Sequence, residues 1–151
     1  MNQSRLLFLA SWVILVVVST AILLFSLAST MRAYSGATDN LTPTLTTERM
    51  RESGDDAVNA FRGRRVTAAT SALAYSILSL FVVVVPYRRA ERWAWWAILF
   101  SVGLSQLLSV ARLPVIGASG GAGTSGIVLS FFLLGLMAGA PRILFPHRGS
   151  D

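Results

Sequence analysis

The sequence predicts an all-α integral membrane protein, a four-helix bundle with four transmembrane helices, and three observations lead to that fold class. The chain has 151 residues, of which 54% are hydrophobic and 13% charged, and its mean hydropathy is +0.62. A soluble domain carries about 25% charged residues, so roughly half of the expected charge is missing. Four charge-free runs each exceed the roughly 18 residues that a transmembrane helix needs. These runs are Leu6–Met31, Val66–Tyr87, Trp93–Ala111 and Leu113–Pro141. No second domain or repeat separates them, which predicts a single membrane domain over residues 1–151.

The first span is predicted over residues 6–29. Its apolar run is about twice as long as the hydrophobic region of a secretory signal peptide, which favours an uncleaved anchor. The small-residue sequence Ser26-Leu27-Ala28 resembles a cleavage site, so cleavage is the alternative.

The polar segment 31–64 is predicted to be a loop between the first two spans. Residues 33–40 are rich in turn formers and are expected to be irregular. From about Thr46 onward, apolar residues recur at helical spacing, which predicts an amphipathic helix. Its apolar face would carry Met50, Ala57, Val58 and Phe61. This helix either lies on the membrane surface or caps the bundle, or it extends the second span beyond the bilayer.

The other spans are predicted over residues 65–85, 93–110 and 124–140. Pro86 and Pro141 are expected to end the second and fourth spans, because proline removes a helical hydrogen bond. A short Arg-rich loop joins the second span to the third. A glycine-rich connection precedes the fourth span, and it lacks the strand and the Lys-Ser/Thr pair of a phosphate-binding loop.

The charge distribution bears on orientation and on partners. Thirteen basic residues, all Arg, outnumber seven acidic residues and give a net charge of +6. In a membrane protein such an excess is typical of loops that face an anionic leaflet, and we expect the lipid bilayer, not nucleic acid, as the partner. Six Arg lie on the side of the termini and seven on the other side. The short, Arg-dense second loop favours both termini in the cytoplasm, and the location that we expect is the plasma membrane.

Three of the four tryptophans, Trp93, Trp95 and Trp96, follow this loop at the predicted headgroup level. Indole rings favour the membrane interface because they combine an apolar body with one hydrogen-bond donor. The pattern predicts an interfacial aromatic belt, and a ring-lined ligand site is the alternative.

Residues 86–96 read Pro-Tyr-Arg-Arg-Ala-Glu-Arg-Trp-Ala-Trp-Trp. This segment resembles one found in small four-helix bacterial integral membrane proteins that are themselves uncharacterised. The resemblance implies a four-span bundle with the Arg-rich second loop inside the cell, and it implies no activity and no site residues. Those proteins are expected to carry Gly where this chain has Ala90, which predicts a less sharp turn here.

Small residues recur every fourth position in the third and fourth spans. They are Ala97, Ser101, Ser105 and Ser109 in the third span, and Gly135 and Gly139 in the fourth. This spacing lets helix backbones approach closely. We expect these residues to pack helices within the chain. The alternative is a surface for a homo-oligomer or a larger membrane complex, for which Gly135 and Gly139 are the best candidates.

Two polar residues of the third span are candidates for ligand or lipid contact. Gln106 lies near the middle of the span, where an unpaired amide is costly, so it is expected to face the bundle interior. Arg112 lies near the far end and can extend to the headgroups. Alternatively, both residues line an internal cavity at whose mouth Arg112 holds an anionic headgroup.

No Asp, Glu or His lies inside a predicted span, and the chain has no Cys. A proton-coupled transporter needs a titratable group in the membrane, and an intramembrane enzyme needs a base, a nucleophile or a metal. The sequence therefore predicts no enzyme, no cofactor and no metal site. Two function classes remain. The first is a structural or accessory membrane protein that acts through helix contacts, and the second is a binder or carrier of a lipid-like molecule near Gln106 and Arg112.

Overall fold

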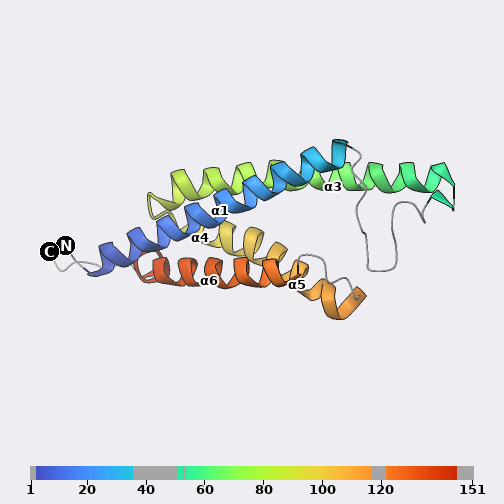
Figure 1. Ribbon diagram of the computed structural model, residues 1–151. Coiled ribbons are helices and arrows are strands. Elements are labelled where there is room, and N and C mark those ends of the chain that lie inside the picture. The colour runs from blue at the N-terminus through green and yellow to red at the C-terminus, as the bar shows by residue number, and fades with distance from the viewer. Residues whose placement is uncertain (1–2, 36–50, 53, 117–121, 146–151) are drawn as a thin grey trace. The chain divides into compact units, whose positions relative to one another are not determined.

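The computed structural model describes residues 3–35, 51–52, 54–116 and 122–145 (Figure 1). Regular structure in these ranges is entirely helical, which confirms the all-α prediction for the described part of the chain. The α-helices are α1 (Gln3–Ser35), α3 (Asp55–Val82), α4 (Arg92–Ile98), α5 (Leu104–Ile116) and α6 (Ala122–Leu144). Two π-helical segments, η1 (Val83–Tyr87) and η2 (Leu99–Gly103), continue α3 and α4.

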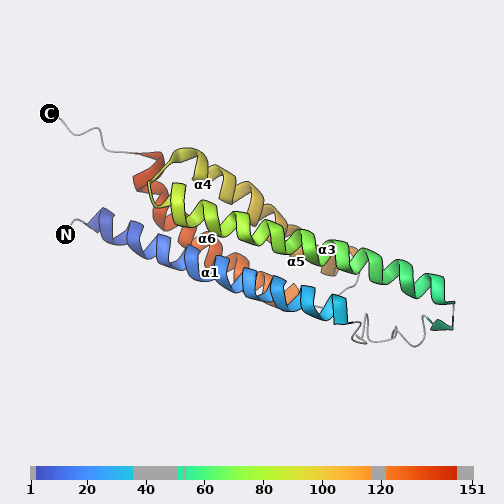
Figure 2. The same ribbon diagram turned by 90° about the horizontal axis from the view of Figure 1, so that it is seen from above.

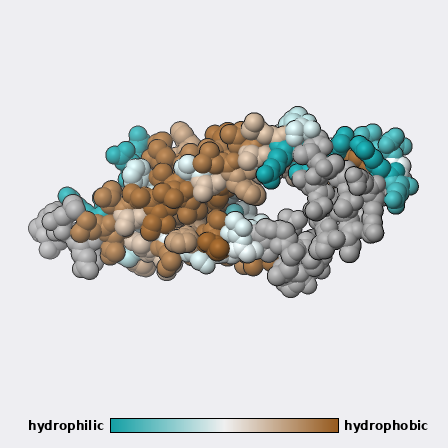
Figure 3. Space-filling model, in the orientation of Figure 1, coloured by the Kyte–Doolittle hydropathy of each residue, from teal (hydrophilic) through white to brown (hydrophobic). Residues whose placement is uncertain are grey.

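Four helical segments are long enough and apolar enough to cross a membrane. They are Arg5–Ser35, Asp55–Tyr87, Arg92–Ala111 and Gly123–Leu144, and each contains or largely overlaps one predicted span. Many of their large apolar side chains lie on the outside, and Phe25, for example, is 71% exposed. Figure 3 shows this apolar surface over α1, α4 and α6, whereas the N-terminal part of α3 is hydrophilic.

The described part of the first polar loop is helical at both ends. Residues 33–35, predicted to be irregular, form the last turn of α1, and residues 36–50 lie outside the described residues. The helix α3 begins at Asp55, and its first turn carries two carboxylates that interact favourably with the positive end of the helix dipole. Residues 55–64 therefore extend the second span N-terminally, which is one of the two alternatives for the amphipathic segment.

The prolines do not end the helices where the sequence predicts. Pro86 lies inside η1, and α6 continues past Pro141 to Leu144, so neither proline is the last residue of its helix. Proline removes one backbone hydrogen bond of the helix, which kinks a helix as well as breaking one, so a proline does not by itself fix the last residue.

The turn between η1 and α4 is tight. The N–H of Glu91 donates to the carbonyl of Pro86 (3.2 Å), and the N–H of Ala90 donates to that of Tyr87 (2.8 Å). These two bonds define a Schellman motif, whose central residue adopts the left-handed conformation that glycine favours. Ala90 occupies that position with φ of 58°. The expectation that alanine makes the turn less sharp is therefore wrong, because the two hydrogen bonds hold Ala90 in the conformation of a glycine.

The chain divides into two compact units. Unit 1 comprises Met1–Ala21 and Leu78–Asp151, and unit 2 comprises Ile22–Ile77. Within unit 1, the first turn of α1, the turn between η1 and α4 and the last turn of α6 lie at the same end (Figures 1 and 2). We call this the terminal end of unit 1.

Candidate functional site

A buried hydrogen bond joins two helical elements near the terminal end of unit 1. The Ser11 hydroxyl on α1 and the Tyr87 hydroxyl on η1 are 2.6 Å apart, and both side chains are 0% exposed. Gly139 of α6 makes room for this pair. A Cβ at position 139 would overlap the Tyr87 hydroxyl and would lie 2.5 Å from the Ser11 Oγ. The elements α1, η1 and α6 therefore meet at Gly139, where α6 has no space for a side chain.

Gly135 makes a similar close approach one turn away. A Cβ at this position would lie 2.8 Å from Ile14 Cγ2 and 3.3 Å from Leu15 Cδ2 of α1. The Gly135/Gly139 pair therefore packs α6 within the chain, which is the first of the two alternatives that the sequence offers. Because α1 and Tyr87 already occupy this face, it is not available to a second copy.

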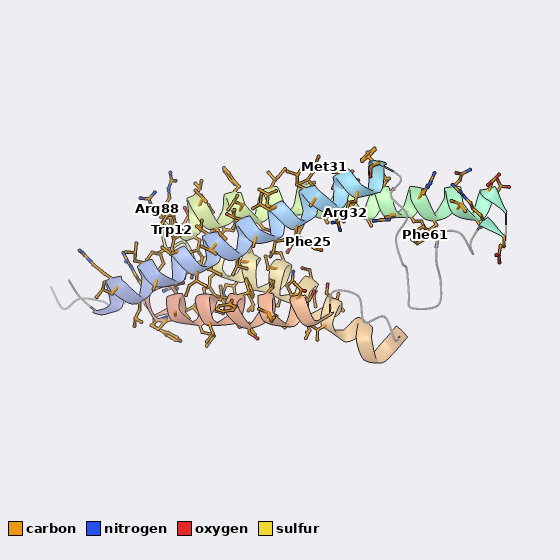
Figure 4. The ribbon with its side chains drawn as sticks, in the orientation of Figure 1. Trp12, Phe25, Met31, Arg32, Phe61 and Arg88 are labelled. Atoms are coloured by element: carbon orange, nitrogen blue, oxygen red, sulfur yellow. The ribbon has the colours of Figure 1, made fainter. Side chains whose placement is uncertain are left out.

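Two arginines and three aromatic rings form a cluster around this point. The Arg142 guanidinium carbon lies 4.5 Å from the centre of the Phe8 ring. Phe8 in turn stacks on Tyr87, with ring centres 5.8 Å apart and planes inclined by 13°. The Arg88 guanidinium carbon lies 5.1 Å from the centre of the Trp12 ring (Figure 4). We call these five residues the aromatic clasp.

The indole N–H of Trp12 makes a second contact with the chain. Its indole Nε1 donates to the backbone carbonyl of Val83 in η1 (3.2 Å). This carbonyl belongs to the first residue of the π-helical segment η1. The indole thus ties α1 to η1 while its ring faces Arg88.

The three tryptophans of the predicted belt do not share one environment. Trp93 is 56% exposed and Trp96 is 46% exposed, and the Trp93 indole donates to the Glu91 carboxylate (2.5 Å). Trp95 is only 6% exposed, and its indole donates to the backbone carbonyl of Leu136 in α6 (3.0 Å). The assignment of Trp95 to the belt is wrong, because successive helical residues point in different directions and Trp95 points at α6.

The serine stripe of the third span is partly buried, as is Ala97. Ser105 donates to the carbonyl of Val102 and Ser109 to that of Ser105, so both hydroxyls bond within their own helix. Ser101, also part of this stripe, lies within η2. These serines therefore form no hydrogen bond to another helix among the described residues.

Sequence reasoning missed Gly103, which contributes a contact between helices. It lies at the end of η2 and is buried, and a Cβ there would lie 3.4 Å from the Phe132 ring of α6. An isolated glycine inside an apolar run is the sequence signal that could have identified it.

Of the two candidate ligand residues, the structure describes the side chain of Gln106 alone. Gln106 is partly buried, and its amide forms no hydrogen bond with another described residue. The backbone of Arg112 belongs to α5, but its side chain lies outside the described residues. The prediction for Arg112 therefore stays a prediction.

Unit 2 contains a second set of polar contacts between helices. The hydroxyls of Ser26 on α1 and Ser76 on α3 are 2.9 Å apart, and the Thr30 hydroxyl donates to the carbonyl of Ala69 (3.1 Å). The Tyr75 hydroxyl oxygen is buried and has no partner among the described residues. The sequence signal for all of these is a hydroxyl inside a charge-free run, which by itself does not identify a partner.

No known protein family, no curated protein and no solved structure matches this chain. The resemblance of residues 86–96 to small bacterial membrane proteins therefore stays a prediction, and the function is argued from the geometry.

Proposed function

We propose that this protein is an integral membrane protein that crosses the bilayer four times and acts as a non-catalytic structural or accessory component through helix–helix contacts. Four segments of sufficient length and hydropathy support the membrane location. The exposure of large apolar side chains along them also supports it, since a soluble monomer rarely exposes so continuous an apolar surface.

The observation that carries the proposal is the use of polar groups inside the apolar segments. The hydroxyls and indoles of Ser11, Trp12 and Trp95 bond to groups on another helical element, and so do those of Ser26 and Thr30. In hydrocarbon such bonds stabilise helix packing by about 0.6–2 kcal/mol each. Catalysis requires polar groups that converge on a substrate. Here these groups converge on one another, which favours a role in packing.

Gln106 of α5 differs from these groups, because its amide, like the Tyr75 hydroxyl of unit 2, forms no hydrogen bond with another described residue. An amide in a membrane-spanning segment needs a hydrogen-bond partner, and a helix of a second copy or of another subunit can supply it. The same amide supports a second candidate function, the binding of a lipid-like molecule with a polar group at this depth. Gln106 is therefore the residue at which the two functions are tested.

The test is native mass spectrometry of the chain extracted from its own membranes in mild detergent. We expect a defined multimer or a retained protein subunit, and we expect Gln106→Met, which keeps the side-chain length, to shift the protein to monomer. Ser105→Ala is the matched control, because that hydroxyl bonds to its own helix and its loss should leave the assembly intact. A monomer that retains one lipid-like molecule, lost in Gln106→Met, would support the second function. A bare monomer would refute the assembly.

The orientation we propose places both termini in the cytoplasm. Among the described residues, the terminal end of unit 1 carries Arg5, Arg88, Arg89, Arg92 and Arg142. Because seven arginines lie on the other side, the support comes from the short turn between η1 and α4, where dense arginine favours the cytoplasmic side. A reporter fused to the C-terminus tests this orientation, and an extracytoplasmic signal would refute it.

A further inference from the structure

We propose that Arg88 and Arg142 of the aromatic clasp bind the headgroups of anionic phospholipids at the terminal end of unit 1. The proposal rests on the membrane location proposed above, and it adds a ligand class at a place distant in sequence from Gln106 and Arg112.

The first step concerns how the two cations are held. Each guanidinium lies over an aromatic ring of α1, Arg88 over Trp12 and Arg142 over Phe8. A cation–π contact uses the charge of the guanidinium and consumes none of its five N–H donors. The rings thus order two long side chains before any ligand arrives, which lowers the entropy lost on binding.

The second step concerns the positive charge of the two guanidinium groups, which no described carboxylate pairs with. Both guanidinium groups are exposed, and neither forms an ion pair with a described residue. The five described arginines at this end face one described carboxylate, that of Glu91, which accepts a hydrogen bond from Trp93. A phosphate oxyanion is the complementary partner, because the planar guanidinium matches it with two parallel N–H donors.

The third step distinguishes a lipid from a free anion. The apolar segments begin at Arg5 and Arg92 and end at Tyr87 and Leu144, so the arginines of this end lie where hydrocarbon gives way to headgroups. Phe145, 72% exposed, lies at the same end beyond α6. An exposed aromatic side chain at the same end as the arginines suits the apolar part of a phospholipid, whereas inorganic phosphate has no apolar part for it to contact.

The test measures phospholipid retained by the full-length chain after release from nanodiscs made of equal parts phosphatidylglycerol and phosphatidylcholine. By native mass spectrometry we expect the wild type to retain phosphatidylglycerol in preference to phosphatidylcholine. Arg88→Gln and Arg142→Gln should each lower the retained phosphatidylglycerol about tenfold, as expected for the loss of a hydrogen-bonded charge pair. Arg88→Lys, which keeps the charge but loses the planar fork, should fall between the wild type and Arg88→Gln.

Arg89→Gln is the matched control, because Arg89 is exposed in the same turn and has no ring contact among the described residues. An equal loss in Arg89→Gln would overturn the proposal in favour of diffuse attraction. Equal retention of both lipids by the wild type would also overturn it, as would displacement of the lipid by millimolar inorganic phosphate. An alkaline carbonate wash of the membranes comes first. Release of the chain would refute the membrane location, whereas retention with unchanged lipid binding in the variants would refute the headgroup site alone.

Discussion

Gly139→Ala tests the point at which α1, η1 and α6 meet. The added Cβ would overlap the Tyr87 hydroxyl and lie 2.5 Å from the Ser11 Oγ, so at least one of the two hydroxyls has to move. Breaking their hydrogen bond leaves buried polar atoms unsatisfied, at a cost of about 1–3 kcal/mol. Displacing well-packed neighbours costs about 1–3 kcal/mol more. We therefore expect Gly139→Ala to lower the free energy of unfolding by about 2–6 kcal/mol.

The assay is unfolding of the purified chain in mild detergent by added dodecyl sulfate, followed by tryptophan fluorescence. The same substitution is measured in the Ser11→Ala/Tyr87→Phe background, where both hydroxyls are absent. Replacing both partners of a hydrogen bond by apolar groups is close to neutral, so this background should fold. There, Gly139→Ala should cost about 1 kcal/mol or less, because the two nearest atoms are gone and the third nearest, the ring carbon Cζ of residue 87, lies 3.2 Å from the added Cβ.

Gly126→Ala is the control within the same helix. A Cβ at Gly126 has no neighbour within 4 Å, so alanine should be tolerated or stabilise α6 by up to about 1 kcal/mol. Equal costs of Gly139→Ala in the two backgrounds would refute the reasoning, because the cost would then be independent of the hydroxyls. A cost as small as that of Gly126→Ala would refute the close approach itself.

Three further substitutions and one control substitution test the turn and the buried polar groups in the same unfolding assay. Ala90→Gly should stabilise the chain by about 1 kcal/mol, because it relieves the left-handed backbone of the Schellman motif, and a destabilised variant would contradict that geometry. Trp95→Phe should destabilise by about 1–3 kcal/mol, because it removes the hydrogen bond to Leu136 and leaves a smaller ring. Trp93→Phe, at an exposed position, should stay within about 0.5 kcal/mol of the wild type, and equal losses in the two would argue against a buried Trp95. Tyr75→Phe should be neutral or stabilising by about 1 kcal/mol, because it removes a buried hydroxyl without a partner among the described residues, and a clear loss of stability would reveal a partner.

The tryptophans illustrate how far sequence reasoning reaches for the candidate site. Their position after an Arg-rich turn predicts the depth of all three along the helix axis. It does not predict the direction in which each ring points, because neighbouring residues of a helix differ in direction by about 100°. Trp95 is buried and its indole donates to a carbonyl of α6, whereas Trp93 and Trp96 point outward.

For the glycines of the fourth span, too, the sequence predicts a close contact but not the partner in that contact. The four-residue spacing of Gly135 and Gly139 predicts that another backbone approaches closely. The spacing is equally compatible with a second copy of the chain and with a helix of the same chain. The choice is made by the shape of the opposite surface, where Ile14 fills the space at one glycine and the Ser11–Tyr87 pair fills the space at the other.

The sequence by itself determined the helical class and the four apolar segments, because hydropathy and length add up locally along the chain and need no distant partner. It also determined the excess of arginine at the ends of these segments. Only the tertiary structure decided which groups meet: Ser11 pairs with a hydroxyl 76 positions away, and Trp12 donates to a carbonyl 71 positions away. A charge count treats all arginines as equivalent, but among the described arginines only Arg88 and Arg142 lie over rings of α1. Contacts of this kind depend on how helices are rotated and paired, and no local pattern encodes that rotation.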